Sequence, residues 1–351
     1  MEIFSYFEKV KEEYNALEVD KRDIMIWGMG YVDALYQNAF RFDGTQIKYY
    51  ISKDQKGVHN GIEIITPSEI LKKTSNPLIL ICAQNKETVE SIENDINSLS
   101  SHLDHIMITK YFFGKYMDEV FANLENLDTE SARVYSAIIK KMIENDTDAS
   151  ELWADNHYFA VPCFFAPNPK EVYLDMGGYV GDSLEEYLFK KHGAFERYYV
   201  FEPDLANFEA LKRRINRINS EWNFKEDKII AECAGIGRET KELFFDNRNS
   251  ANSSFSSSET GVKQKIWSID DYFKEIKVGV IKADIEGFEL EMLMGAEKII
   301  CRDRPKMCIS IYHNAYDMIF IPKWIRNLNM DYSFCIKQHG VVLDDTVLYA
   351  Y

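Results

Sequence analysis

The hydrophobic pattern of the chain forms two series of short apolar runs that alternate with segments of helical periodicity. The first series contains the runs "DIMIWGMG" (Asp23–Gly30), "IKYYISKD" and "PLILICAQ", and the helical stretch "YVDALYQNAF" follows the first run. Alternation of buried strands with amphipathic helices is typical of parallel α/β sheets. We therefore expect a small Rossmann-like α/β domain over residues 1–114.

A second α/β series begins at Glu171, after a mostly helical connector over residues 115–160 that includes "SARVYSAIIKKMI". Its strand candidates are "EVYLDM", "RYYVFEP", "KIIAECA", "VGVIKAD" and "KMCISIY", and its helix candidates are "DSLEEYLFKKH", "LANFEALKRRIN", "SIDDYFKEI" and "FELEMLMGAEKII". The final stretch, "YSFCIKQHGVVLDDTVLYAY", predicts an antiparallel hairpin. The Ser-rich segment Asn247–Gly261 is expected to be a loop. The second domain, residues 161–351, should thus hold a mostly parallel sheet that ends in a hairpin.

Composition excludes several classes of function. The formal net charge is −16, from 41 basic and 57 acidic residues, which argues against a nucleic-acid-binding surface. No stretch approaches the ~20 apolar residues of a membrane-spanning helix, and the N-terminus lacks the apolar core of a signal peptide. The six cysteines are scattered, so neither a disulfide framework nor a zinc site is expected. We expect a soluble cytoplasmic protein.

A glycine-rich turn follows the first strand of the second series. Asp175 ends that strand, Gly177, Gly178 and Gly181 follow, and Asp182 begins a helix. In open α/β sheets this turn usually carries the ligand, and a dinucleotide would place its pyrophosphate at the helix N-terminus. Two carboxylates would repel a pyrophosphate. They suit a ligand with positive charge, such as S-adenosylmethionine (SAM), which carries an ammonium and a sulfonium group.

A second acid, Glu202, ends the next strand, 27 residues after Asp175. A carboxylate at this position can accept hydrogen bonds from both hydroxyls of a ribose. SAM and NAD share that ribose, so Glu202 does not distinguish them, whereas Asp175 and Asp182 do. The alternative interpretation is that the acids only cap helices, Asp182 for the helix that it begins and Glu202 just before Pro203.

Four segments resemble successive motifs of the FkbM-type methyltransferases. They are "YLDMGGYVGDS", "VFEPDLANFEALK", "IKADIEGFELEMLMGAEKII" and "ISIYHNAYDMIFIPKWI", and the resemblance covers about Val161 to Tyr351. It implies a Rossmann-like class I methyltransferase domain that uses SAM to methylate a hydroxyl of a sugar, a glycan or a related small molecule. One departure is Gly178-Tyr179, where the family usually has Ala-Asn. The resemblance also implies cofactor contacts from Ser183, Pro203 and Ala234.

Three residues of the second domain are candidates for the chemistry. Asp284 ends the strand "VGVIKAD", Glu286 follows two residues later, and His313 follows the next strand. His313 is the best candidate for the base, because an imidazole can be neutral and basic near pH 7; a cap or a core hydrogen bond is the alternative. Carboxylates with a histidine also match a hard-metal site, but no metal is expected to be required. Lys282, inside the strand, is expected to be structural.

The first domain has its own Gly28-x-Gly30 turn, with Asp54 as a candidate ribose acid. A G-x-G pattern alone is a weak signal. The stretches "YYISKDQKG" and "GIEIITPSEI" resemble Rossmann-like modules attached to sugar-modifying enzymes. Such a module could bind a sugar nucleotide, form a homodimer face or have no ligand. The rival functions for the whole chain are a non-catalytic SAM or nucleotide sensor and an NAD(P)-linked oxidoreductase that uses Gly28 and Gly30.

Overall fold

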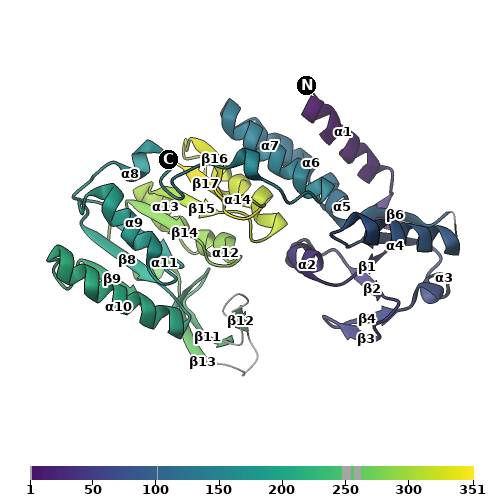
Figure 1. Ribbon diagram of the computed structural model, residues 1–351, viewed down its shortest axis with the longest axis horizontal. Coiled ribbons are helices and arrows are strands. Elements are labelled where there is room, and N and C mark those ends of the chain that lie inside the picture. The colour runs from purple at the N-terminus through teal and green to yellow at the C-terminus, as the bar shows by residue number, and fades with distance from the viewer. Residues whose placement is uncertain (1, 101, 247–253, 257–261) are drawn as a thin grey trace. The chain divides into compact units, whose positions relative to one another are not determined.

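A computed structural model describes residues 2–100, 102–246, 254–256 and 262–351. The chain divides into two compact units, each built around a mainly parallel sheet (Figure 1). The first unit comprises Met1–Ser150 with Asn314–Ile319, and the second comprises Glu151–His313 with Phe320–Tyr351. The architecture is therefore mixed α/β, as the alternation of apolar runs and helices predicts.

The first unit has a sheet of six strands among its described residues, in the order β3-β4-β2-β1-β5-β6. All neighbours pair in parallel except β3 and β4. The strands are β1 (Asp23–Trp27), β2 (Ile47–Ile51), β3 (Gly57–His59), β4 (Ile62–Ile65), β5 (Pro77–Ile81) and β6 (Asp104–Met107). The helices are α1 (Glu2–Asn15), α2 (Tyr31–Asp43), α3 (Ile70–Lys73), α4 (Lys86–Leu99), α5 (Ile108–Lys115), α6 (Met117–Leu124) and α7 (Thr129–Glu144).

The second unit has a sheet of seven strands among its described residues, in the order β16-β17-β15-β14-β7-β8-β9. The strands are β7 (Val172–Met176), β8 (Arg197–Phe201), β9 (Ile229–Glu232), β14 (Val280–Ala283), β15 (Lys306–Ser310), β16 (Phe334–Gln338) and β17 (Thr346–Ala350). The helices are α8 (Pro162–Phe165), α9 (Asp182–Lys191), α10 (Leu205–Trp222), α11 (Ile269–Tyr272), α12 (Glu289–Met294) and α13 (Glu297–Asp303). Helix α14 (Ala315–Asn327) is divided between the units: its residues up to Ile319 belong to the first and the rest to the second. Strand β17 pairs antiparallel with both β15 and β16, which confirms the predicted C-terminal hairpin.

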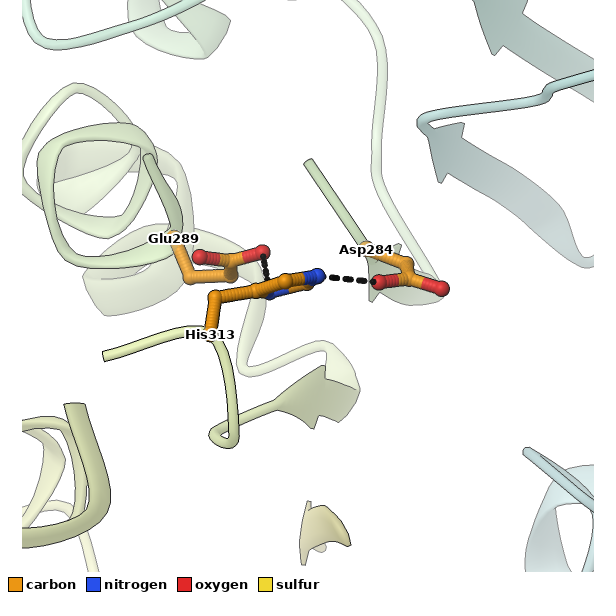
Figure 2. A group of neighbouring side chains, drawn as sticks. All are labelled: Asp284, Glu289 and His313. Carbon is orange, nitrogen blue, oxygen red and sulfur yellow. Dashed lines mark ion pairs between the residues drawn. The ribbon is translucent and has the colours of Figure 1, made fainter. Parts of the chain in front are cut away.

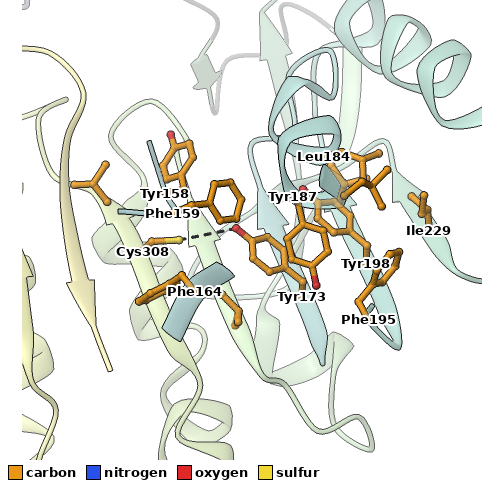
Figure 3. Packing of buried hydrophobic residues seen from close by; sticks show 14 of the residues in the cluster. Tyr158, Phe159, Phe164, Tyr173, Leu184, Tyr187, Phe195, Tyr198, Ile229 and Cys308 are labelled. Carbon is orange, nitrogen blue, oxygen red and sulfur yellow. Dashed lines mark hydrogen bonds between the residues drawn. The ribbon is translucent and has the colours of Figure 1, made fainter. Parts of the chain in front are cut away.

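The strands of the large sheet are buried on both faces because side chains alternate along each strand. On β8, Tyr198 lies in an aromatic core with residues of α9 and α10, where it stacks on Tyr173 with ring centroids 5.1 Å apart (Figure 3). Its neighbour Tyr199 points to the opposite face and meets Phe273, just after α11, with ring centroids 5.0 Å apart. This packing holds the carboxyl ends of the strands in fixed positions.

Three features differ from the sequence prediction. A second sheet, β10-β13-β11-β12, was not expected; its strands are β10 (Gly235–Ile236), β11 (Lys241–Asp246), β12 (Ser254–Ser256) and β13 (Val262–Trp267). The helix expected over 288–300 is divided into α12 and α13, and Gly295 at the junction lies so close to Gly237 that a Cβ there would be 2.3 Å from the Gly237 carbonyl oxygen. Apart from the three residues of β12, the predicted Ser-rich loop lies outside the described residues.

The predicted connector, residues 115–160, is shared between the two units. Helices α6 and α7 pack with α1 and α5, so the first unit extends to Ser150 instead of ending near Gly114. Consequently residues 151–160 belong to the second unit. No helix in the described part of the chain has the length and apolar character needed to cross a membrane.

Candidate active site

A cavity of about 460 Å³ lies in the second unit, where β7, β8 and β14 end. Parallel sheets bind ligands at this edge because the loops after the strands meet there. Gly177 follows β7, Glu202 follows β8 and Asp284 follows β14, and all three line the cavity. Carboxylates dominate the polar lining: Asp182, Glu202, Asp204, Asp284, Glu286 and Asp345.

The glycine turn is required by close packing between strands. Gly177 has φ +86°, and a Cβ there would lie 1.8 Å from the Asp284 carbonyl oxygen. A Cβ at Gly178 would lie 2.0 Å from Val200 Cγ2. Both glycine N–H groups donate to the Phe201 carbonyl at 3.0 Å. Of the three predicted glycines, Gly177 lines the cavity, whereas Gly178 and Gly181 shape the turn behind it.

Asp175, which the sequence predicts to contact the ligand, is buried, is not among the residues that line the cavity, and is already paired. Its Oδ1 lies 2.9 Å from Lys282 Nζ, and Oδ2 accepts a hydrogen bond from the Tyr198 hydroxyl at 2.5 Å. Lys282 Nζ also donates to the Gly177 carbonyl at 2.7 Å. Burial lowers the pKa of Lys282, but Asp175 and Asp284 more than offset this, so its pKa is raised and it stays charged. Lys282, expected to be purely structural, also lines the cavity.

Glu202 lies where the ribose acid was predicted. Its two carboxylate oxygens accept the N–H groups of Tyr179 and Asp204, both at 2.9 Å. Each oxygen keeps a second lone pair for a hydroxyl. Burial raises the pKa of Glu202 to about 7, so half of these carboxyls are protonated at neutral pH when no ligand is bound.

The helix-cap alternative does not explain the two acids. The cap of α9 is Gly181, and Asp182 is the first helical residue, with its side chain exposed on the cavity wall. The cap of α10 is Asp204, whose side chain accepts N–H groups of the first turn. Glu202 is therefore free of a capping role, and Ser183, Pro203 and Ala234 line the cavity as the resemblance implies.

Asp284 is the central acid at the other end of the cavity. Its Oδ2 accepts a hydrogen bond from Tyr158 at 2.6 Å, and its Oδ1 accepts a longer one from Tyr312 at 3.3 Å. Burial raises the pKa of Asp284, but Lys282 and His313 outweigh that effect and lower it. Asp284 is thus ionised at neutral pH.

Glu286 reaches the cavity because the backbone after β14 takes an unusual turn. Glu286 has φ +56° and Gly287 has φ +90°, so two successive residues adopt the left-handed conformation. Such strain in a non-glycine residue is concentrated at functional sites. The turn leaves the Glu286 side chain exposed, with Oε2 3.6 Å from His313 Nε2.

His313 lies between carboxylates, as Figure 2 shows for Asp284 and Glu289. Nδ1 is 2.9 Å from Glu289 Oε1, and Nε2 is 3.3 Å from Asp284 Oδ1. Burial alone would lower the pKa of His313, but Glu289, Asp284 and Glu286 raise it to about 10. The raised pKa favours the imidazolium form, whereas the sequence predicts a neutral base, and His313 is not among the residues that line the cavity.

Two residues of the site come from the predicted connector and were missed. Tyr158 binds Asp284, and His157 stacks on Tyr158 with ring centroids 3.9 Å apart. Burial lowers the pKa of His157 to about 4, so this cavity-lining imidazole is neutral. Asp345, in the C-terminal hairpin, was also missed. No motif spacing marks these positions; the "HYF" run before Val161 was the only signal.

The Gly28-x-Gly30 turn of the first unit has a structural explanation. Gly28 has φ +112°, and a Cβ there would lie 2.1 Å from the Cys82 carbonyl oxygen. Gly28 is therefore needed for close approach of the ends of β1 and β5. Asp54, the candidate ribose acid, is exposed in the loop after β2.

Comparisons with known proteins agree with this geometry. Residues 175–334 match the sequence family described as Methyltransferase FkbM domain. A search of curated proteins finds no match. The crystal structure of a methyltransferase FkbM from Methylobacillus flagellatus is similar over 99% of both chains, with a TM-score of 0.58 and 18% identity, so the fold of both units is shared.

Two further solved structures are similar over about half of this chain. An rRNA methylase from Streptococcus thermophilus has 12% identity and a TM-score of 0.36, with 56% of this chain and 96% of that chain covered. A putative methyltransferase from Streptococcus mutans in complex with SAH has 9% identity and a TM-score of 0.33, with 52% and 90% covered. The matched residues 175–334 include Gly177, Glu202 and Asp284 of the cavity wall. The chain therefore carries a methyltransferase FkbM domain in its second unit, and it is a methyltransferase whose cofactor is SAM.

Proposed function

We propose that the protein is an O-methyltransferase that transfers the methyl group of SAM to a hydroxyl of a sugar, a glycan or a related small molecule. One observation carries the proposal: a single cavity joins Glu202 and the glycine turn to the acidic cluster around Asp284 and Glu286. The first end suits the cofactor, and the second suits a neutral acceptor that donates hydrogen bonds.

The cofactor residues of the proposal follow from the cavity wall. Glu202 would accept the ribose hydroxyls, while Gly177 allows close approach to the backbone and Asp182 faces the positively charged part. SAM supplies a methyl group on a positively charged sulfur. Since Asp175 is neutralised by Lys282, the charge that favours SAM over NAD comes from Asp182 and the other cavity acids.

The acceptor residues are those around Asp284. An acceptor hydroxyl bound to the carboxylates of Asp284 and Glu286 would have its oxygen held in place and its proton drawn away. The oxygen then forms a bond to the methyl carbon as the carbon–sulfur bond breaks, and the electron pair of that bond stays on sulfur. Tyr158 holds Asp284 in position, and His313 balances part of the negative charge.

An acceptor screen tests this function. The full-length protein is incubated with methyl-labelled SAM and hydroxylated sugars, glycans and small molecules, each beside an amine analogue. We expect label on oxygen, and turnover at least ~100-fold slower in Asp284→Asn, within the range for a lost acid or base. The exposed Glu297→Gln is the matched control and should leave turnover unchanged. Label on nitrogen alone would contradict the proposal.

We also propose that the protein is cytoplasmic and forms a homodimer. The net charge of −16 and the scattered positions of the six cysteines support a cytoplasmic protein. A homodimer through the first unit is a prediction that light scattering of the full-length protein can check. The six carboxylates of the cavity support a small, uncharged acceptor over a nucleic acid.

A further inference from the structure

His313 is held in a way that suits a metal ligand. Its side chain is about nine-tenths buried, and Nε2 makes no hydrogen bond of ordinary geometry with the residues that the structure describes. Glu289, which is fully buried, lies against Nδ1 at 2.9 Å and also accepts the Ile285 N–H at 2.8 Å. Metal-binding histidines are commonly fixed in this way by a carboxylate at the ring nitrogen that does not bind the metal.

The opposite nitrogen, Nε2, faces two acids of the cavity wall. It lies 3.3 Å from Asp284 Oδ1 and 3.6 Å from Glu286 Oε2 (Figure 2 shows the first). Oxygen and nitrogen ligands of one cation, each about 2.1 Å from it, lie about 3 Å apart. Ligand atoms of Asp284, Glu289 and His313 all lie within 4.8 Å of one another.

The net negative charge around His313 also favours a bound cation. Asp284, Glu286 and Glu289 surround a single imidazole, so the cluster is negative whether or not the ring is protonated. Lys282, the lysine on the cavity wall, is already paired with Asp175 at 2.9 Å. Buried carboxylates are normally paired or bound to a metal.

We propose that Asp284, Glu286 and His313 bind one divalent cation of the Mg²⁺ or Mn²⁺ class at the acceptor end of the cavity. Two carboxylates favour Mg²⁺ and Mn²⁺, and the imidazole favours Mn²⁺ of these two. This inference departs from the expectation that no metal is required.

The cation deepens the proposed function, on which this part of the inference rests. Three protein ligands of an octahedral cation leave three positions for acceptor oxygens and water. Two adjacent hydroxyls of one acceptor can fill two of them. The cation then lowers the pKa of the bound hydroxyl, whose proton leaves to water. The preferred acceptor is therefore a vicinal diol.

Binding of Mn²⁺ alone tests the site without activity. The full-length protein is stripped with EDTA, transferred to metal-free buffer and titrated with Mn²⁺, and free Mn²⁺ is followed by its electron paramagnetic resonance signal. We expect one Mn²⁺ per chain, at least tenfold weaker binding in Glu286→Gln and in Asp284→Asn, and unchanged binding in Glu297→Gln. Because Glu286 is exposed, its variant should fold normally.

Two results would overturn the site: no stoichiometric Mn²⁺ binding by the wild type, or equal binding by all variants, which would mean adventitious binding only. SAM affinity, measured by calorimetry in EDTA, separates this failure from failure of the proposed function. Wild type that binds SAM but no Mn²⁺ refutes the cation alone. With Mn²⁺ present, a diol acceptor methylated no faster than its monodeoxy analogue refutes the diol preference.

Discussion

The raised pKa of Glu202 predicts that SAM binding depends on pH. The carboxyl titrates near pH 7 in the free protein because it is buried, and only its ionised form can accept hydrogen bonds from both ribose hydroxyls. The fraction that is ready to bind is about one-tenth at pH 6 and about nine-tenths at pH 8. SAM affinity should therefore rise about tenfold from pH 6 to pH 8.

The sign follows from linkage. A ligand that binds the ionised carboxyl releases a proton, so affinity increases with pH until the carboxyl is fully ionised. At pH 7 about half a proton should leave Glu202 for each SAM bound. Calorimetry in buffers of different ionisation enthalpy measures this release directly.

Glu202→Gln provides the baseline, because the amino group of SAM also titrates. The variant should bind SAM ~1.5–3 kcal/mol more weakly at pH 8, the range for hydrogen bonds to a charged group, and it should lose the Glu202 part of the pH dependence. A variant with the same pH profile as the wild type would refute the assignment of Glu202 as the ribose acid. So would a wild-type affinity that rises as the pH falls.

Three other substitutions test the turn and the acceptor end. Gly177→Ala should lower the free energy of unfolding in urea by at least ~2 kcal/mol, since its φ is +86° and the new Cβ would meet the Asp284 carbonyl. The control Gly30→Ala has open space around the new Cβ and should lower the free energy of unfolding by less than ~1 kcal/mol. Tyr158→Phe removes a 2.6 Å hydrogen bond to ionised Asp284, so turnover should be ~10- to 100-fold slower with SAM affinity unchanged. Turnover equal to that of the wild type would contradict the proposed role of Asp284. Tyr179→Asn should raise stability by ~1 kcal/mol, because Tyr179 has φ +44°, which asparagine adopts more readily, and a lower melting temperature would contradict this.

The main strands could be predicted because each is a continuous apolar run that needs no knowledge of its neighbours. The sheet β10-β13-β11-β12 could not be predicted in this way. Strand β10 has only two residues, and β11 and β13 contain charged lysine and glutamate side chains, so the pairing of these strands depends on contacts distant in sequence. The need for glycine at position 295 is equally non-local, since it arises from the backbone of Gly237.

Site residues at the ends of strands could be predicted from the sequence, but the side chains that pair with them could not. Glu202 and Asp284 were located because a strand's end fixes which sheet edge its last residue occupies. The pairing of Asp175 could not be predicted without the strand register, because Lys282 on β14 lies directly opposite Asp175 on β7. A lysine inside an apolar strand was the signal, since a buried charge requires a partner. The protonation state of His313 depends on Glu289, which is separated from it in sequence by most of α12, all of α13 and β15, so it could not be predicted without the structure.

Because Asp175 is paired with Lys282, other residues must provide the negative charge that favours SAM over a dinucleotide. The sequence assigns the selectivity to Asp175 and Asp182 together, yet the charge of Asp175 is paired with Lys282 inside the protein. What remains on the cavity wall is a set of acids from four different strand ends and loops, whose nearest lysine is already engaged. Such a surface repels pyrophosphate and phosphodiester groups from either end, and it attracts cations and hydrogen-bond donors. The same unbalanced charge supports three of the proposals together: a sulfonium cofactor instead of a dinucleotide, a small acceptor instead of a nucleic acid, and a divalent cation beside His313.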